Sequence, residues 1–259
     1  SVEEVRDPSL KGKPVVVGGK ANERGVVSAA SYAARRFGVR SAMPLREAYR
    51  RCPQAIFLQG DPKSYRDYSR KVHDVLRRFS PLVEQASIDE AYLDLTGTER
   101  LFGPPLAAAH RMHEAVGEAT GLPCSAGLGS SRLAAKIASG LAKPNGVLWI
   151  PPGAEAAFLA PLDIKRIPGV GKVMQRSLRE IGVERIGQLA EIDPKLLESR
   201  FGKPGLALRG KAAGLDSGGW FSGEIGARGG PKSIGHETTF GEDTADRALL
   251  DAPLAKRVQ

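Results

Sequence analysis

The chain has 259 residues, of which 41% are hydrophobic and 26% are charged. This composition is typical of a globular protein and excludes a wholly disordered chain. The two cysteines, Cys52 and Cys124, are too few for a disulfide scaffold. No apolar run approaches the roughly 18–20 residues that a membrane span needs. We therefore expect a protein of the reducing cytoplasm that makes no contact with a membrane.

Basic residues exceed acidic ones throughout most of the chain. Lys and Arg number 38 against 29 Asp and Glu, which gives a net charge of +9. Residues 1–61 carry +5 of this excess, whereas residues 217–259 carry −1. A basic surface attracts polyanions, and nucleic acid is the commonest of these. Charge alone thus makes nucleic acid a candidate partner and does not establish it.

The first part of the chain alternates short strands with short helices. Residues 14–19 predict a buried strand closed by a glycine turn, and residues 26–30 predict a second strand. A short helix follows, which Gly38 can end in the left-handed conformation. The next helix is expected between Pro44, which suits a first turn, and Pro53, which ends it.

The middle of the chain changes its periodicity. Apolar residues at three-four spacing over 62–79 predict an amphipathic helix. Residues 82–95 predict two strands joined by a turn near 87–89. A helix, a strand, a helix and a strand are expected next, at 104–120, 124–128, 131–142 and 147–150. This alternation around an antiparallel hairpin predicts an α+β layer with helices on one face of a sheet.

The last part of the chain has a different character. Residues 154–213 predict short helices with tight turns and no strand. The run 217–230 is rich in Gly, Ser and Arg and is typical of a linker. Residues 232–240 resume an extended pattern, but too few residues follow the linker for a core of their own. We therefore expect the native protein to continue beyond this end.

Two adjacent carboxylates stand at the predicted hairpin turn, in Ser87-Ile88-Asp89-Glu90. Apolar strand flanks them on both sides, so a sheet would present them rigidly. Carboxylates held in this way can bind the paired divalent ions of phosphoryl transfer. The dipeptide by itself is more typical of a solvated turn, because acidic residues favour turns, and the flanking apolar strands are what favour a metal site.

An aromatic residue and two guanidinium groups share one face of the short helix near residue 32. Tyr32, Arg35 and Arg36 are three and four residues apart, which places them side by side. Arginine matches phosphate oxygens with two parallel hydrogen bonds, so this face is a candidate triphosphate clamp. A solvated basic helix face would have the same pattern.

A lysine precedes a tight turn in Ala142-Lys143-Pro144-Asn145-Gly146. Lys143 would stand at a helix C-terminus, where a cation also interacts favourably with the helix dipole. The Pro-Asn-Gly turn would fix its position, and from there its ammonium group could reach phosphate oxygens.

A glycine turn opens a helix at Gly169-Val170-Gly171-Lys172. Such a turn exposes backbone N–H groups that bind a phosphate without reading sequence. The pattern indicates a helix-hairpin-helix that contacts the DNA backbone. The Gly-Lys-Ser/Thr ending of a nucleotide-binding P-loop is absent.

Other candidates carry weaker signals. His110 and His113 are three residues apart without a glutamate signature, so we interpret them as surface residues rather than zinc ligands. Cys52 and Cys124 are interpreted as core or half-buried thiols.

Taken in order, these motifs resemble the Y-family DNA polymerases. Ser-Ile-Asp-Glu-Ala-Tyr-Leu-Asp at 87–94 and Ala-Lys-Pro-Asn-Gly at 142–146 carry the resemblance most specifically. Lys-Ser-Ile-Gly-His-Glu at 232–237 adds to it, and the similarity extends over essentially the whole chain. Within the family, the chain is most similar to the bacterial DinB-type translesion enzymes.

The resemblance implies roles for individual residues. Asp89 matches a metal-binding carboxylate and Glu90 the catalytic carboxylate beside it. Tyr32 and Arg35 match residues that contact the incoming triphosphate, and Lys143 matches a lysine on the same triphosphate. The activity implied is template-directed addition of deoxynucleoside triphosphates to a primer, with two Mg²⁺ ions. Primer–template DNA would be the main partner, a sliding clamp a further one, and the protein a monomer.

The resemblance also implies a right-hand polymerase architecture. Fingers would occupy residues 1–61, a ferredoxin-like palm 62–150, and an all-helical thumb with the helix-hairpin-helix 151–216. A linker would follow at 217–231 and the start of a little-finger domain at 232–259.

The chain departs from the family pattern at its beginning. The family carries a metal-binding aspartate and an aromatic residue that rejects ribonucleotides just before a Ser-Val-Glu run, and this chain begins at that run, Ser1-Val2-Glu3. We therefore expect a chain truncated at both ends, with weak activity or none. Two alternatives stay open: a non-catalytic DNA-binding protein that uses the helix-hairpin-helix, and a nucleotide cyclase with a palm-like sheet.

Overall fold

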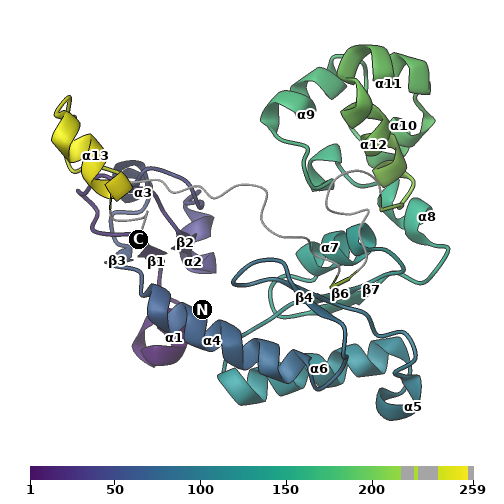
Figure 1. The fold of residues 1–259 in the computed structure, drawn as a ribbon, viewed down its shortest axis with the longest axis horizontal. Coiled ribbons are helices and arrows are strands. Elements are labelled where there is room, and N and C mark those ends of the chain that lie inside the picture. Colours follow the sequence, from purple (N-terminus) through teal and green to yellow (C-terminus); the bar gives the residue numbers. More distant parts are fainter. Residues whose placement is uncertain (217–224, 227–238, 256–259) are drawn as a thin grey trace. The chain divides into compact units, whose positions relative to one another are not determined.

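The computed structural model describes residues 1–216, 225–226 and 239–255. The chain divides into two compact units, Ser1–Asp67 with Gly230–Gln259, and Tyr68–Gly229. Helix α4 (Pro62–Leu76) begins in the first unit and continues into the second (Figure 1). Each unit is described by itself below. No helix among the described residues is long and apolar enough to cross a membrane.

The first unit is built around a three-stranded sheet in the order β2-β1-β3. β1 (Val15–Val17) is buried along its whole length, as its run of three valines predicts. β2 (Ala29–Ala30) pairs with it antiparallel and β3 (Ile56–Leu58) parallel. The helical elements of this unit's first 61 residues are α1 (Val2–Arg6), the 3₁₀ turn η1 (Pro8–Leu10), α2 (Tyr32–Arg36) and α3 (Leu45–Arg51).

In this unit one strand prediction needed correction and one strand was missed. The strand expected at residues 26–30 is reduced to β2, because Val26 pairs instead with Pro44 in an isolated bridge. β3 was not anticipated, since its three residues lack the alternation that marks a half-buried strand. The short helix and its end at Gly38, with φ of +80°, are as predicted.

The second unit begins with the predicted hairpin. β4 (Val83–Gln85) pairs antiparallel with β5 (Ala91–Leu93), and Glu84 lies opposite Tyr92. The short helix α5 (Glu99–Phe102) precedes α6 (Pro105–Thr120), which ends at Gly121 in the left-handed conformation, as predicted. Apolar residues of α4, α6 and the hairpin share one core, whose buried members are Val75, Leu76, Phe79 and Val116.

A strand-helix-strand unit follows the hairpin. β6 (Ala126–Leu128) and β7 (Val147–Trp149) are parallel, and α7 (Arg132–Leu141) connects them. Gly127 on β6 lies so close to α7 that a Cβ there would be 2.1 Å from the Ala135 carbonyl oxygen. Only glycine therefore permits this packing of helix on strand. The described strands thus form three small sheets rather than one continuous sheet.

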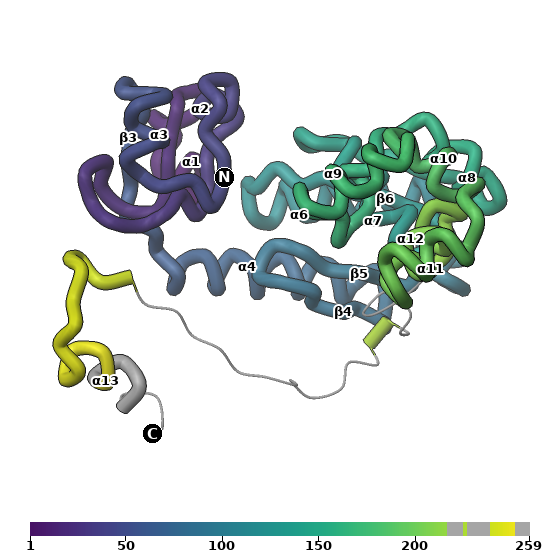
Figure 2. Tube along the Cα trace, turned by 90° about the horizontal axis from the view of Figure 1, so that it is seen from above, coloured from purple at the N-terminus to yellow at the C-terminus, as the bar shows by residue number. Residues whose placement is uncertain are grey.

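Residues 154–213 of the second unit are helical, as predicted. α9–α12 form one group, which is drawn apart from β4, β6 and β7 in Figure 1 and overlaps β6 and α7 in the view of Figure 2. Its elements are α8 (Glu155–Leu159), η2 (Ile164–Arg166), α9 (Lys172–Arg179), α10 (Ile186–Glu191), α11 (Pro194–Phe201) and α12 (Lys203–Ala212). Leu133 and Ile137 of α7 are members of the core of this group. Helix α7 is thereby shared between the sheet layer and the helical group.

Residues after the helical group are described only in part. The predicted linker at 217–231 and the extended pattern at 232–240 lie largely outside the described residues. Helix α13 (Arg247–Ala255) belongs to the first unit.

Candidate active site and DNA-binding hairpin

The acidic turn between β4 and β5 is closed by backbone and side-chain hydrogen bonds. The N–H groups of Ala86 and Ser87 both donate to the Glu90 carbonyl, at 2.9 and 3.1 Å. The Ser87 hydroxyl donates to Oδ1 of Asp89 at 2.6 Å. Asp89 is exposed and Glu90 half-buried. The turn therefore presents two carboxylates from a fixed backbone, as the sequence predicted.

Helix α7 provides a cation for each of two acids on this hairpin. Lys136 forms an ion pair with Glu90 across the gap between α7 and the turn. One turn earlier, Nη2 of Arg132 lies 2.8 Å from Oε2 of Glu84 on β4, with both side chains almost fully buried. The buried Arg132–Glu84 pair joins β4 to α7, and the more exposed Lys136–Glu90 pair lies beside it at the turn.

Tyr92 completes the buried end of this arrangement. The guanidinium carbon of Arg132 lies over its ring, 5.7 Å from the ring centroid. Burial, together with the nearby Glu90 charge, raises the pKa of Tyr92 to about 12. The phenol therefore stays neutral at any physiological pH.

The N-terminus of α7 is bound by residues that follow the helical group. Both carboxylate oxygens of Asp216 accept backbone N–H groups there, from Arg132 at 2.8 Å and Leu133 at 2.9 Å. The Ser131 hydroxyl donates to the Gly214 carbonyl at 2.9 Å. An acid at a helix N-terminus is also favoured by the helix dipole. The end of the helical group thus fixes where α7 begins.

Lys143 follows Ala142, the C-cap residue of α7, and is exposed. The turn after it is held because Oδ1 of Asn145 accepts the Cys124 backbone N–H at 3.1 Å. Asn145 has a φ of +52°, which asparagine tolerates better than most residues. The Pro-Asn-Gly turn thus fixes the backbone at Lys143, and the lysine side chain is exposed.

Tyr32 and Arg35 lie together on α2, in the first unit. The Ser31 hydroxyl caps this helix by accepting the Ala34 N–H at 3.2 Å. The Arg35 guanidinium carbon lies 5.8 Å from the centroid of the Tyr32 ring. Nε of Arg35 donates to the Ala30 carbonyl at 3.0 Å, which uses one of the five N–H donors of the guanidinium. Asp89, Glu90 and Lys143 belong to the second unit.

The glycine turn at residues 169–171 leads into α9, as predicted. Gly169 has a φ of +94°, which explains glycine at that position. The N–H groups of Val170 and Gly171 are used within the turn, donating to Ile167 at 3.1 Å and Gly169 at 3.2 Å. Among the described residues, no side chain caps the N-terminus of α9. The backbone donors that suit a phosphate are therefore those of the first turn of α9, beginning at Lys172.

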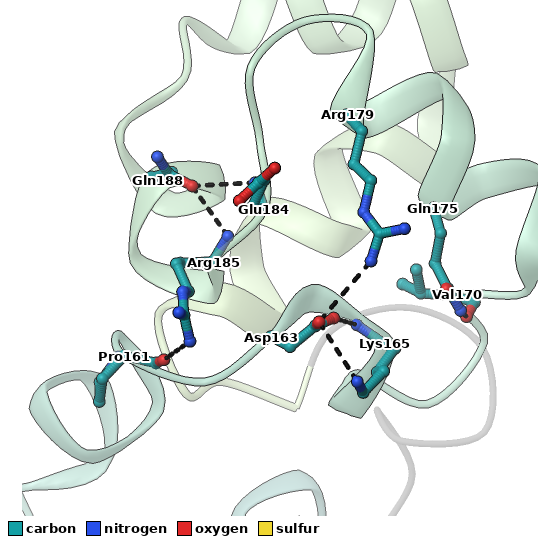
Figure 3. Close-up of polar contacts among 9 residues, drawn as sticks. All are labelled: Pro161, Asp163, Lys165, Val170, Gln175, Arg179, Glu184, Arg185 and Gln188. Carbon is teal, nitrogen blue, oxygen red and sulfur yellow. Dashed lines mark hydrogen bonds and ion pairs between the residues drawn. The ribbon is translucent and has the colours of Figure 1, made fainter.

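Two side chains donate hydrogen bonds to backbone carbonyl groups at the glycine turn. Nε2 of Gln175 donates to the Val170 carbonyl at 2.9 Å (Figure 3). Nζ of Lys211 on α12 donates to the Pro168 carbonyl at 3.2 Å, and burial lowers the pKa of this lysine. The turn is thus braced by its own helix and by α12.

Asp163 connects the segment before the turn to α9. Its Oδ1 accepts the Lys165 N–H at 2.8 Å, and its Oδ2 lies 3.6 Å from Nη2 of Arg179 (Figure 3). The backbone hydrogen bond from Lys165 is the main reason that the pKa of Asp163 is lowered. This carboxylate therefore stays ionised and joins the two arms of the hairpin.

The weaker candidates behave as ordinary structural residues. His110 is exposed, as expected, whereas His113 is half-buried and its Nε2 lies 3.0 Å from the Cys124 carbonyl oxygen. Burial raises the pKa of the thiols of Cys52 and Cys124, which keeps them protonated.

The donor set at the acidic turn suits a hard divalent cation. Asp89 and Glu90 offer carboxylate oxygens, the ligands that Mg²⁺ prefers. Within the described ranges, no group of three or more His, Cys, Asp or Glu side chains could hold a metal ion. Sites of this kind bind Mg²⁺ through one or two carboxylates together with substrate phosphates and water, so the residues present fit the ion.

Sequence reasoning missed several residues that shape these sites. Arg132 and Lys136 are four residues apart on the predicted helix 131–142, and this spacing was the available signal for a cationic face. Their acidic partners could not be identified, because Glu84 lies 48 residues from Arg132. Gln175 and Lys211, which donate hydrogen bonds to the glycine turn, could not be identified from the sequence, since each binds a backbone carbonyl group and every residue has one.

Comparison with known proteins identifies the family. Residues 1–140 match the model of the impB/mucB/samB family, and residues 152–183 match the IMS family HHH motif. The chain belongs to the impB/mucB/samB family. These are the Y-family DNA polymerases, and this chain is of the DinB type. The helix-hairpin-helix prediction and the predicted fold class are confirmed.

The sequences of curated relatives align with almost the whole chain. DNA polymerase IV of Dehalococcoides mccartyi (strain CBDB1) is 44% identical over 98% of this chain and 64% of that protein. DNA polymerase IV of Halorhodospira halophila (strain DSM 244 / SL1) is 42% identical over 98% of this chain and 70% of that protein. The chain thus spans 64% of the length of the first of these relatives.

Solved structures show the same fold. The crystal structure of DinB from Sulfolobus solfataricus matches with a TM-score of 0.76 and 35% identity, over 82% of this chain and 63% of that one. An insertion ternary complex of Dbh DNA polymerase matches with a TM-score of 0.72 and 33% identity, over 84% of this chain and 65% of that one.

Proposed function

We propose that this chain is the catalytic part of a template-directed DNA polymerase of the translesion type. It adds deoxynucleoside triphosphates to a primer 3′-hydroxyl and releases pyrophosphate. The observation that carries this proposal is the role of α7, which pairs with Glu84 and Glu90 of the acidic hairpin and ends two residues before Lys143. One helix therefore joins a metal-binding turn to a phosphate-binding lysine. Membership of the family and the two DNA polymerase IV relatives support the same reaction.

The proposed reaction depends on positioning and charge rather than on a covalent intermediate. Asp89 and Glu90 hold divalent cation, and Tyr32, Arg35 and Lys143 hold the triphosphate. Two Mg²⁺ ions, when bound, neutralise the triphosphate and make the 3′-hydroxyl a better nucleophile. The fixed backbone of the hairpin turn keeps both carboxylates oriented without reorganisation during the reaction.

DNA is held by the helix-hairpin-helix in this proposal. The first-turn N–H groups of α9 bind one phosphate, and Gly169, Val170 and Gly171 allow the backbone to approach it. Lys172 adds a positive charge beside the same phosphate. Arg176 and Arg179 on α9 are exposed and extend the basic surface.

The proposed domain organisation follows the family. Residues 1–61 act as fingers, 62–150 as palm and 151–216 as thumb, with a linker at 217–231 and the start of a little finger at 232–259. Primer–template DNA and deoxynucleoside triphosphates are the partners, and the protein acts as a cytoplasmic monomer. A sliding-clamp contact belongs to the same proposal and depends on the resemblance alone.

Primer extension tests the proposal. The chain is first extended by the N-terminal strand that carries the family's metal-binding aspartate. This extended protein is incubated with a labelled primer–template, deoxynucleoside triphosphates and Mg²⁺, alongside its Glu90→Gln variant and the exposed control Glu118→Gln. We expect extension by the unchanged extended protein and by the control, and a loss of at least a hundredfold with Glu90→Gln, as is typical when a transition-state charge partner is removed. Extension by Glu90→Gln at the rate of the unchanged chain would refute the assignment.

Triphosphate binding separates this proposal from a DNA-binding module without catalysis. A polymerase site binds a labelled triphosphate more tightly as Mg²⁺ is added. A DNA-binding module without catalysis binds no triphosphate, with or without Mg²⁺. DNA affinity measured against salt gives a second readout. Lys172→Ala should reduce the slope of log affinity against log salt by about 0.9, the value for one phosphate contact.

A further inference from the structure

Two ion pairs between α7 and the acidic hairpin differ sharply in their surroundings. The Arg132 and Glu84 side chains are 6% and 4% exposed, and a second contact of 3.4 Å joins Nη1 to Oε1. The Lys136 and Glu90 side chains are 32% and 42% exposed. The two cations are one helical turn apart, so the same helix face carries a buried pair and a solvated one.

The buried pair is suited to fix the position of α7. Removing either partner would leave a charge in a site with little access to water, which is strongly unfavourable. Arginine also matches a carboxylate with a rigid planar fork. The distance between the helix and β4 is therefore set by Arg132 and Glu84, independently of what Lys136 does.

The solvated Lys136–Glu90 pair can separate when another cation binds Glu90. Exposed ion pairs contribute little to stability, because water screens them and the side chains lose freedom on pairing. A lysine ammonium is a compact, strongly hydrated charge on a flexible stem, so it can leave its partner without a change in the backbone. Asp89, the neighbouring acid, instead accepts a hydrogen bond from the Ser87 hydroxyl.

We propose that Lys136 is an exchangeable counter-ion of Glu90, which neutralises this carboxylate until a divalent cation binds there and displaces the ammonium group. The proposal rests on the metal site of the proposed function and adds that Lys136 sets its affinity. The ammonium and the metal compete for the same carboxylate oxygens. Without a cation beside Glu90, the adjacent charges of Asp89 and Glu90 would repel each other at the turn.

Mn²⁺ binding to the full chain tests this inference without reference to catalysis. Free Mn²⁺ is measured by electron paramagnetic resonance for the unchanged chain, Lys136→Met and the exposed control Lys195→Met. An exposed pair is worth roughly 0.2–1 kcal/mol, so we expect Lys136→Met to bind Mn²⁺ about 1.5- to 5-fold more tightly. Lys195→Met should bind as the unchanged chain does, since Lys195 lies on α11.

A double-mutant comparison separates competition at Glu90 from a general change in charge. In a Glu90→Gln background, Lys136→Met should no longer tighten Mn²⁺ binding, because the shared carboxylate is gone. Lys136→Arg keeps the charge and the helix, and it should bind Mn²⁺ no more tightly than the unchanged chain.

The outcomes distinguish failure of this inference from failure of the metal site. If the unchanged chain binds Mn²⁺ and Lys136→Met binds it equally or more weakly, the exchange proposal is overturned and the metal site stands. If the unchanged chain binds no Mn²⁺, the metal site of the proposed function is overturned as well. If Lys136→Met unfolds, tighter binding by Lys136→Arg than by the unchanged chain overturns the exchange proposal.

Discussion

The approach of α7 to β6 gives the sharpest structural prediction. A Cβ at Gly127 would lie 2.1 Å from the Ala135 carbonyl oxygen and 2.2 Å from the Ser139 backbone nitrogen. Ordinary contacts between such atoms are about 3.5 Å or longer. Both obstacles are backbone atoms of a helix, so no rotamer change relieves them. Gly127→Ala must therefore move α7 away from β6 by about 1 Å or more.

Overpacking of this kind typically costs about 1–3 kcal/mol, and two backbone obstacles favour the upper end. One kcal/mol lowers the melting temperature of a domain of this size by about 2–4 °C, so we expect a fall of about 6–12 °C. The shift also moves Lys136, which lies on α7, and Lys143, which lies two residues beyond its end. Thermal unfolding followed by circular dichroism measures the first effect, and primer extension measures the second.

Gly140→Ala provides a matched control on the same helix. A Cβ at Gly140 would meet nothing within 4 Å. Alanine also reduces the freedom of the unfolded chain, so this variant should gain about 0.4–1 kcal/mol. A Gly127→Ala variant that melts within 1 °C of the unchanged chain would contradict the packing argument, and so would equal shifts for the two variants.

Three further predictions concern stability and DNA binding. Burial lowers the pKa of His73 below its usual 6.5, so its contribution to the free energy of unfolding is full above pH 6.5 and is lost as the pH falls below that value. His73→Leu should therefore reduce the pH dependence of the free energy of unfolding, measured with urea between pH 7.5 and pH 5. An unchanged pH dependence would contradict this. Glu84→Gln removes the carboxylate charge that faces the buried Arg132 guanidinium and should cost about 3–5 kcal/mol in urea unfolding, against at most about 0.5 kcal/mol for the control Glu47→Gln, whose pair with Arg51 is more exposed. Gln175→Met removes the donor to the Val170 carbonyl and should weaken DNA binding with an unchanged salt slope, because no phosphate-binding charge is lost; a reduced slope would contradict this.

The sequence alone determined the local structure and the family. The hairpin at residues 82–95, the helix ended by Gly121 and the glycine turn before α9 follow from periodicity and turn chemistry, which depend on neighbouring residues. The motif Ser87-Ile88-Asp89-Glu90 also pointed to the acidic turn, since its residues are adjacent in the chain.

Only the tertiary structure decided which distant residues meet. The pairs of Arg132 with Glu84 and of Lys136 with Glu90 join residues more than 40 positions apart, and Asp216 reaches α7 from 84 residues away. Such contacts depend on how α7 packs against β6, and that packing depends on the missing Cβ of Gly127. Side-chain periodicity says which face of a helix is buried, but not which partner covers it, because the partner is chosen by the close packing of the whole unit.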